Sequence, residues 1–190
     1  MSQVCLPDDG IVRDIKDVKA VMYLHKLNSK CAECGEDHPV CLLYFDEKTE
    51  KTVNAKAVNR LRARNRNISI EGLVKLLDGF TILCQNCKRK RYPEPGPPWF
   101  PVHLQRELNR FKTKQGCIHC EERNSRCLDF HHRDSEEKLF TIGHGSVLDK
   151  EAIELEMQKC DVTCRNCHTK EHWFDEWFSP PAEETPRPSS

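Results

Sequence analysis

The sequence contains little of what a large apolar interior requires. Aromatic residues make up 7% of its 190 residues and hydrophobic residues 37%, whereas charged residues reach 32%. This composition favours small modules that need stabilisation beyond their own cores. No apolar run approaches the roughly 20 residues that cross a bilayer, so no membrane association is expected.

An export signal is missing as well. The N-terminus reads Met1-Ser-Gln-Val-Cys-Leu-Pro-Asp-Asp, without the basic and apolar stretches of a secretory leader. We therefore expect an intracellular, cytoplasmic protein in a reducing compartment. Its 12 cysteines then favour metal binding over disulfides.

Neither sign of charge is in excess, since 30 Lys and Arg balance 30 Asp and Glu. Positive charge is nevertheless dense at two places, Arg60-Leu-Arg-Ala-Arg-Asn-Arg66 and Lys88-Arg-Lys-Arg91. A local basic patch attracts a polyanion even when the chain is neutral overall. Taken alone, both runs are equally typical of a solvated surface.

The chain is an internal repeat. A shift of 86 residues places Cys31, Cys34 and Cys41 on Cys117, Cys120 and Cys127, and each unit closes with a second Cys-x-x-Cys pair. Two such pairs per unit are typical of a closed tetrahedral zinc site. The sequence thus predicts two structural zinc ions. The ligands are Cys31, Cys34, Cys84 and Cys87 in the first unit and Cys117, Cys120, Cys164 and Cys167 in the second.

Cys41 and Cys127 also match between the units, but each stands alone and precedes an apolar residue. We interpret them as small buried side chains rather than ligands.

Helix patterns recur in both units. Apolar spacing predicts helices over 12–27 and 102–114, one at the start of each unit. A later helix in each unit begins after an N-cap residue, Ser69 before 70–77 and Asp149 before 150–159.

The segment 93–101 separates the units because its prolines exclude regular structure. We therefore predict a first module at 1–92, a stiff linker at 93–101, a second module at 102–178 and a disordered tail at 179–190.

The second unit has histidines that a structural zinc site does not need. In a strand over Cys127-Leu-Asp-Phe-His-His132, Asp129 and His131 share one face and His132 lies on the other. His168 and His172, at i and i+4, lie on one face of a helix, a spacing that suits two imidazoles binding one divalent metal.

These motifs, in this order over residues 116–173, resemble the HNH, or ββα-metal, nuclease family. The resemblance implies an α+β fold of two tandem zinc-stapled ββα-type modules with little extended core. It also implies that His131, His168 and His172 bind a catalytic Mg²⁺, Mn²⁺, Ni²⁺ or Zn²⁺ and that His132 is the general base. Asp129 would orient either the strand or a ligating histidine. The family's central asparagine position falls at Lys159.

The chemistry that this resemblance implies is hydrolysis of DNA phosphodiester bonds to 5′-phosphate and 3′-hydroxyl ends. The DNA is expected to be double-stranded. Because one centre per chain cuts one strand, cleavage of both strands would require a homodimer or two encounters.

The first unit lacks this histidine set. Phe45 and Asp46 stand at the positions of His131 and His132, and Lys88 and Tyr92 replace His168 and His172. We expect the first unit to be a non-catalytic module that positions DNA. Its candidate phosphate contacts are Arg60, Arg62, Arg64, Arg66, Lys88, Arg89, Lys90 and Arg91.

Two alternatives stay open at this point. One is a non-catalytic zinc adaptor that binds nucleic acid or protein. The other is a nuclease toxin or defence effector, which shares the chemistry and differs in its target.

Overall fold

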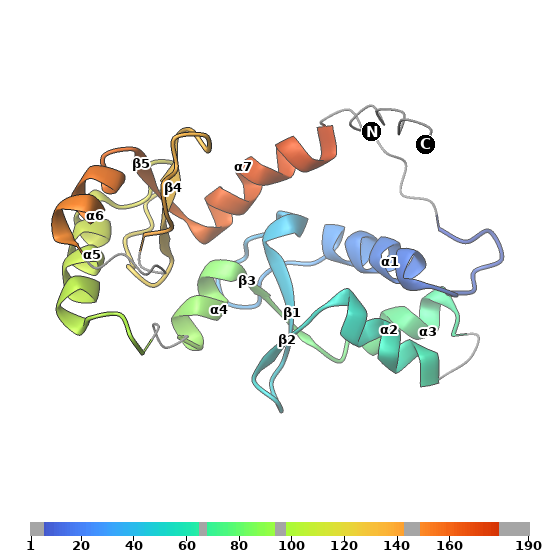
Figure 1. The fold of residues 1–190 in the computed structure, drawn as a ribbon. Coiled ribbons are helices and arrows are strands. Elements are labelled where there is room, and N and C mark those ends of the chain that lie inside the picture. Colours follow the sequence, from blue (N-terminus) through green and yellow to red (C-terminus); the bar gives the residue numbers. More distant parts are fainter. Residues whose placement is uncertain (1–5, 65–67, 94–97, 143–148, 179–190) are drawn as a thin grey trace, which may run out of the picture.

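The computed structural model describes residues 6–64, 68–93, 98–142 and 149–178. Among these residues, seven α-helices accompany two small antiparallel sheets, which confirms the α+β class. Figure 1 shows the sheets and helices of the two halves side by side. No helix in the described part of the chain has the length and apolar character needed to cross a membrane.

The first unit is built on β1 (Leu42–Asp46), the central strand of a sheet in the order β2-β1-β3. Its partners are β2 (Lys51–Val53) and β3 (Thr81–Cys84), both antiparallel. The other elements are α1 (Ile15–Leu27), η1 (Pro39–Cys41), α2 (Ala55–Arg64), α3 (Ile70–Leu77) and α4 (Gln85–Arg91).

The second unit repeats this plan without counterparts of η1, β2 and α2 among its described residues. It consists of α5 (Val102–Gln115), β4 (Leu128–His132), α6 (Lys150–Met157), β5 (Cys160–Cys164) and α7 (Arg165–Phe178). β4 pairs with β5 in antiparallel register, with His132 opposite Cys160 and Leu128 opposite Cys164. The strand predicted for the Leu-Asp-Phe-His-His segment is therefore present.

The predicted caps define where the later helices begin. The Ser69 hydroxyl accepts a hydrogen bond from the backbone N–H of Gly72, and the Asp149 carboxylate accepts one from Ala152. Each bond satisfies a donor that the first helical turn leaves unpaired. α6 ends at Met157, two residues before its predicted end.

The units differ in their cores. In the first unit, buried side chains from α1, β1, α2 and α3 form one cluster around Tyr44, Leu73 and Leu77. In the second unit, the corresponding cluster is smaller and consists of Phe100, Leu104, Leu108 and Ile153. The first unit therefore has more apolar burial with which to hold its fold.

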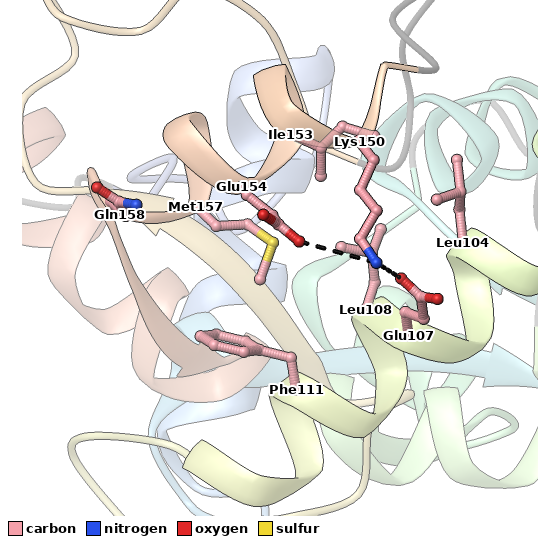
Figure 2. Close-up of a pocket in the computed structure, with 9 residues that line it drawn as sticks. All are labelled: Leu104, Glu107, Leu108, Phe111, Lys150, Ile153, Glu154, Met157 and Gln158. Carbon is pink, nitrogen blue, oxygen red and sulfur yellow. Dashed lines mark ion pairs between the residues drawn. The ribbon is translucent and has the colours of Figure 1, made fainter.

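An open groove of about 400 Å³ lies between α5 and α6 (Figure 2). Leu108, Phe111 and Met157 lie along it, and Lys150 forms ion pairs with Glu107 and Glu154 beside it. No histidine lines the groove.

The two units contact each other through pairs of equivalent residues, as if a two-fold axis related the units. The backbone N–H of Asn86 donates to Asn166 Oδ1 at 3.2 Å, and the backbone N–H of Asn166 donates to Asn86 Oδ1 at 3.3 Å. Lys90 forms an ion pair with Glu122, and the equivalent Lys170 forms one with Glu36. The same surface of each unit thus contacts the other, as in an isologous dimer.

Candidate metal centres

Two groups of four cysteines converge as the sequence predicts. The thiols of Cys31, Cys34, Cys84 and Cys87 form one group, and those of Cys117, Cys120, Cys164 and Cys167 form the other. Within each group the sulfur atoms lie no more than 4.8 Å apart. Four sulfur ligands converging in this way suit tetrahedral zinc.

Backbone donors support these sulfur atoms. Cys117 Sγ accepts hydrogen bonds from the backbone N–H groups of His119 and Cys164, at 3.4 and 3.1 Å. Burial opposes the ionisation of Cys117, but the backbone donors outweigh it and lower the pKa of its thiol. The thiolate is the form that binds zinc.

Cys41 and Cys127 lie outside both groups. Burial raises the pKa of each thiol to about 12, so both stay protonated at neutral pH. Cys41 Sγ donates to the carbonyl oxygen of Asn166, and Cys127 Sγ donates to that of Asn86, each at 3.4 Å. Both thiols therefore contribute hydrogen bonds to the contact between the units.

A third group consists of His131, His168 and His172. β4 supplies the first imidazole and the start of α7 supplies the other two. One nitrogen of each ring lies within 4.8 Å of the other two, and the Nε2 atoms of His168 and His172 are 2.8 Å apart. Burial and the neighbouring His168 lower the pKa of His131, which favours the neutral imidazole that ligates metals.

Asp129 lies on the same face of β4 as His131 and beside His168 of α7. Its Oδ2 is 3.9 Å from His168 Nδ1, and neither buried atom has a hydrogen-bond partner among the described residues. A carboxylate behind the Nδ1 of a histidine would fix its tautomer and direct Nε2 at a metal. The donor set therefore fits a divalent ion held by His131, His168 and His172.

Neighbouring groups keep the carboxyl group of Asp129 ionised. Burial opposes its ionisation, but His168 and the guanidinium of Arg89 outweigh burial and lower the pKa of Asp129 to about 2. Arg89 Nη1 lies 2.9 Å from Asp129 Oδ1. Arg89 belongs to α4 of the first unit, so this contact crosses between the units.

His132 lies apart from the three clustered histidines, on the face of β4 that packs toward α6. Its side chain is 8% exposed, and its Nε2 lies 2.8 Å from Oε1 of Glu156, which is 1% exposed. Oε2 of Glu156 pairs with Lys159 Nζ at 2.9 Å. Lys159 therefore balances the charge of the carboxylate that contacts His132.

The first unit contains an aromatic stack where the second has its histidines. Phe45 and Tyr92, the counterparts of His131 and His172, stack with ring centroids 4.4 Å apart. Asp46, the counterpart of His132, instead caps a turn by accepting from Lys48 N and Thr49 Oγ1. No group of metal-binding side chains lies at this position in the described part of the first unit.

The basic residues predicted to bind nucleic acid fall into two sets. On α4, Arg89, Lys90 and Arg91 pair with Asp129, Glu122 and Glu47 respectively, and Lys88 also has a partner. On α2, Arg62 donates to Asn59 and Val12, whereas Arg60 and Arg64 are exposed. Arg66 lies outside the described residues.

Sequence reasoning missed Glu156, and it missed the role of Arg89. Glu156 is one acid among many in an acidic helix, and only its spacing from Lys159 indicated a pair. The sequence-based predictions also left out Arg106, Arg110 and Lys114, which are exposed at positions i, i+4 and i+8 of α5. Because residues four apart lie on one face of a helix, this spacing predicts a row of basic side chains along α5.

Comparisons of the chain with protein-family models, with curated proteins and with solved structures gave no match.

Proposed function

We propose that this protein is a metal-dependent endonuclease of the HNH type that hydrolyses phosphodiester bonds in double-stranded DNA. The observation that supports the proposal is the convergence of His131, His168 and His172 in the second unit, beside the carboxylate of Asp129; the described part of the first unit has no such group. A divalent ion bound there would stabilise the charge that develops on the phosphate and on the leaving 3′ oxygen.

In this mechanism, His132 acts as the general base. In-line displacement requires the attacking water and the leaving oxygen to lie on opposite sides of phosphorus. Neighbouring residues of a strand point to opposite faces, so a phosphate over the end of β4 would have His131 on one side and His132 on the other. Glu156 holds Nε2 of His132, which leaves Nδ1 to accept the proton of the water.

Asp129 has a supporting role. Its Oδ2 faces His168 Nδ1, and this contact would keep the His168 ring oriented toward the other two imidazoles. Asp129 does not touch the substrate in this proposal.

Phosphate contacts are proposed for exposed cations that form no ion pair with a carboxylate among the described residues. Arg60 and Arg64 on α2 form none of the ion pairs found among the described residues, and the same is true of Arg106 and Arg110 on α5. On α4, Arg89 and Lys90 instead pair with carboxylates of the second unit, and Arg91 pairs with Glu47 of the first. We therefore propose that Arg89 and Lys90 join the units and that the α4 run contributes less to DNA binding.

Cleavage of plasmid DNA with added divalent metal tests the proposal. His132→Ala should lower the cleavage rate about 10²–10⁴-fold, the range of general acid–base catalysis. His103→Ala is the matched control, because His103 is exposed on α5 outside all three ligand groups, and it should cleave like the parent. Ligation of the products would verify 5′-phosphate ends.

A parent protein that binds two zinc ions but cleaves neither DNA nor RNA with any of the four metals would contradict the proposal. The non-catalytic zinc adaptor would then be the better description. Equal rates for the parent and His132→Ala would instead reject only the assignment of the base.

A further inference from the structure

Three sets of contacts between the units repeat when the units are exchanged: the asparagine pair, the two thiol donations and the Lys90–Glu122 and Lys170–Glu36 ion pairs. The Asn86–Asn166 pair is reciprocal, and the thiols of Cys41 and Cys127 donate to carbonyl oxygens of these same two asparagines in the opposite unit. Asn86 and Asn166 are 8% and 6% exposed, so these bonds are shielded from water. In an isologous dimer of identical units, the same surface would bind a second copy of the unit. Here that surface of each unit is covered by the other unit.

Among the ion pairs that join the units in the described residues, one breaks this symmetry. The Arg89–Asp129 ion pair would have Thr169 and Leu43 as its exchanged counterpart, and those two side chains cannot form an ion pair. Thr169 instead accepts a hydrogen bond from Gln85 Nε2 at 2.8 Å. The asymmetric contact lies at the three histidines, the feature in which the two units differ most.

The position of Arg89 indicates what this contact does. Its guanidinium binds Oδ1 of Asp129 at 2.9 Å, while Oδ2 of the same carboxylate lies 3.9 Å from His168 Nδ1 and 3.7 Å from Nη1 of Arg165, a residue of the second unit. A second donation, to the carbonyl oxygen of Arg126, anchors the guanidinium on the second unit. Holding one carboxylate oxygen fixes the direction of the other.

We propose that the first unit completes the metal centre of the second, with Arg89 as a positioning residue that acts through Asp129 on His168. The inference rests on the proposed function, because it takes the three histidines as a divalent-metal site. The first unit is then a built-in partner of the second rather than only a module that positions DNA. One chain holds a complete centre without a second copy.

Binding of Co²⁺ to the full chain tests this inference, with both cysteine sites first loaded with zinc. The visible absorption of Co²⁺ reports the histidine site directly. Arg89→Ala should weaken Co²⁺ binding about 10-fold, at the lower end of what loss of a supporting residue costs. Arg89→Gln, which keeps a side-chain donor, should restore part of the affinity.

Arg91→Ala is the matched control, since Arg91 lies on the same helix and pairs with Glu33 and Glu47 inside the first unit. It should bind Co²⁺ like the parent. In an Asp129→Asn background, Arg89→Ala should have little further effect, because both changes interrupt one path. A zinc content of two per chain would show that each variant is folded.

Two results would overturn the inference. Arg89→Ala could bind Co²⁺ as tightly as the parent, so that orientation by Arg89 is irrelevant. It could also bind more tightly, so that the positive charge of Arg89 only repels the ion. A parent that binds no third metal ion would instead reject the metal centre of the proposed function.

Discussion

Both units keep four converging cysteines, but they differ in what lies beside them. In the second unit, three imidazoles meet in front of Asp129; in the first, Phe45 stacks on Tyr92 in the equivalent place. An aromatic stack adds burial and needs no ion, whereas clustered imidazoles add little apolar burial. The difference separates the cysteines, which both units share, from the histidines, to which the proposed function assigns the chemistry.

The same contrast holds on the other face of the strand. His132 and the buried Glu156 of the second unit correspond to Asp46 and Leu76 of the first. A buried carboxylate is costly to desolvate and gives little net stability even when it is paired. The second unit retains this group beside His132, whereas the first has an apolar side chain there.

Removal of zinc should have the largest effect on this comparison. Structural zinc contributes about 10–16 kcal/mol in small zinc modules, as much as a typical domain's whole stability. Because its apolar cluster is smaller, the second unit should unfold at a lower chelator concentration than the first. Hydrogen exchange followed by mass spectrometry would resolve the two units, and simultaneous unfolding would contradict the expected order.

Glu156→Leu should have the next largest effect, because it gives the second unit the residue of the first. We expect the cleavage rate to fall about 10²–10⁴-fold, since His132 loses the acceptor that orients it. Lys159 is partly exposed and can turn to solvent, but the backbone N–H of Leu139 loses its acceptor, so the free energy of unfolding should fall by about 1–3 kcal/mol. Plasmid cleavage and urea denaturation measure the two quantities separately.

The outcome of that substitution depends on which role Glu156 has. If Glu156→Leu cleaves normally, His132 needs no orientation by Glu156. If the variant loses its fold, the carboxylate is part of the scaffold. Glu154→Leu is the matched control, because Glu154 is an exposed acid on the same helix.

The sequence alone predicted the features that depend on local spacing. The sequence predicted the cysteine groups, the helix caps at Ser69 and Asp149, and the strand that places Asp129 and His131 on one face. Each follows from the geometry of a few neighbouring residues or from the repeat.

Features that depend on distant partners were not predictable. Arg89 contacts Asp129, which is 40 residues away in the sequence, and Lys170 contacts Glu36, which is 134 residues away. From composition, the α4 run was expected to bind phosphates, because nothing in its local pattern shows which carboxylates the fold brings near. Only the packing of the two units shows these pairings.

The smallest effect expected here tests the symmetry of the joint itself. Asn86→Ala and Asn166→Ala each leave one buried backbone N–H of the other unit without its acceptor, so each should cost about 1–3 kcal/mol of unfolding free energy. Asn166→Ala should cost slightly more, since Asn166 Nδ2 also donates to Glu36 at 3.3 Å. Urea denaturation of both single variants and the double variant would measure this.

The double variant sharpens the test. Because the two asparagines contact each other, their combined cost should differ from the sum of the separate costs. Gln85→Ala is the control, since its partly exposed side chain bonds to Thr169 and Arg165 without a reciprocal partner. Strictly additive costs for the asparagines would mean that the two bonds act independently, and the joint between the units would then not behave as a single symmetric interface.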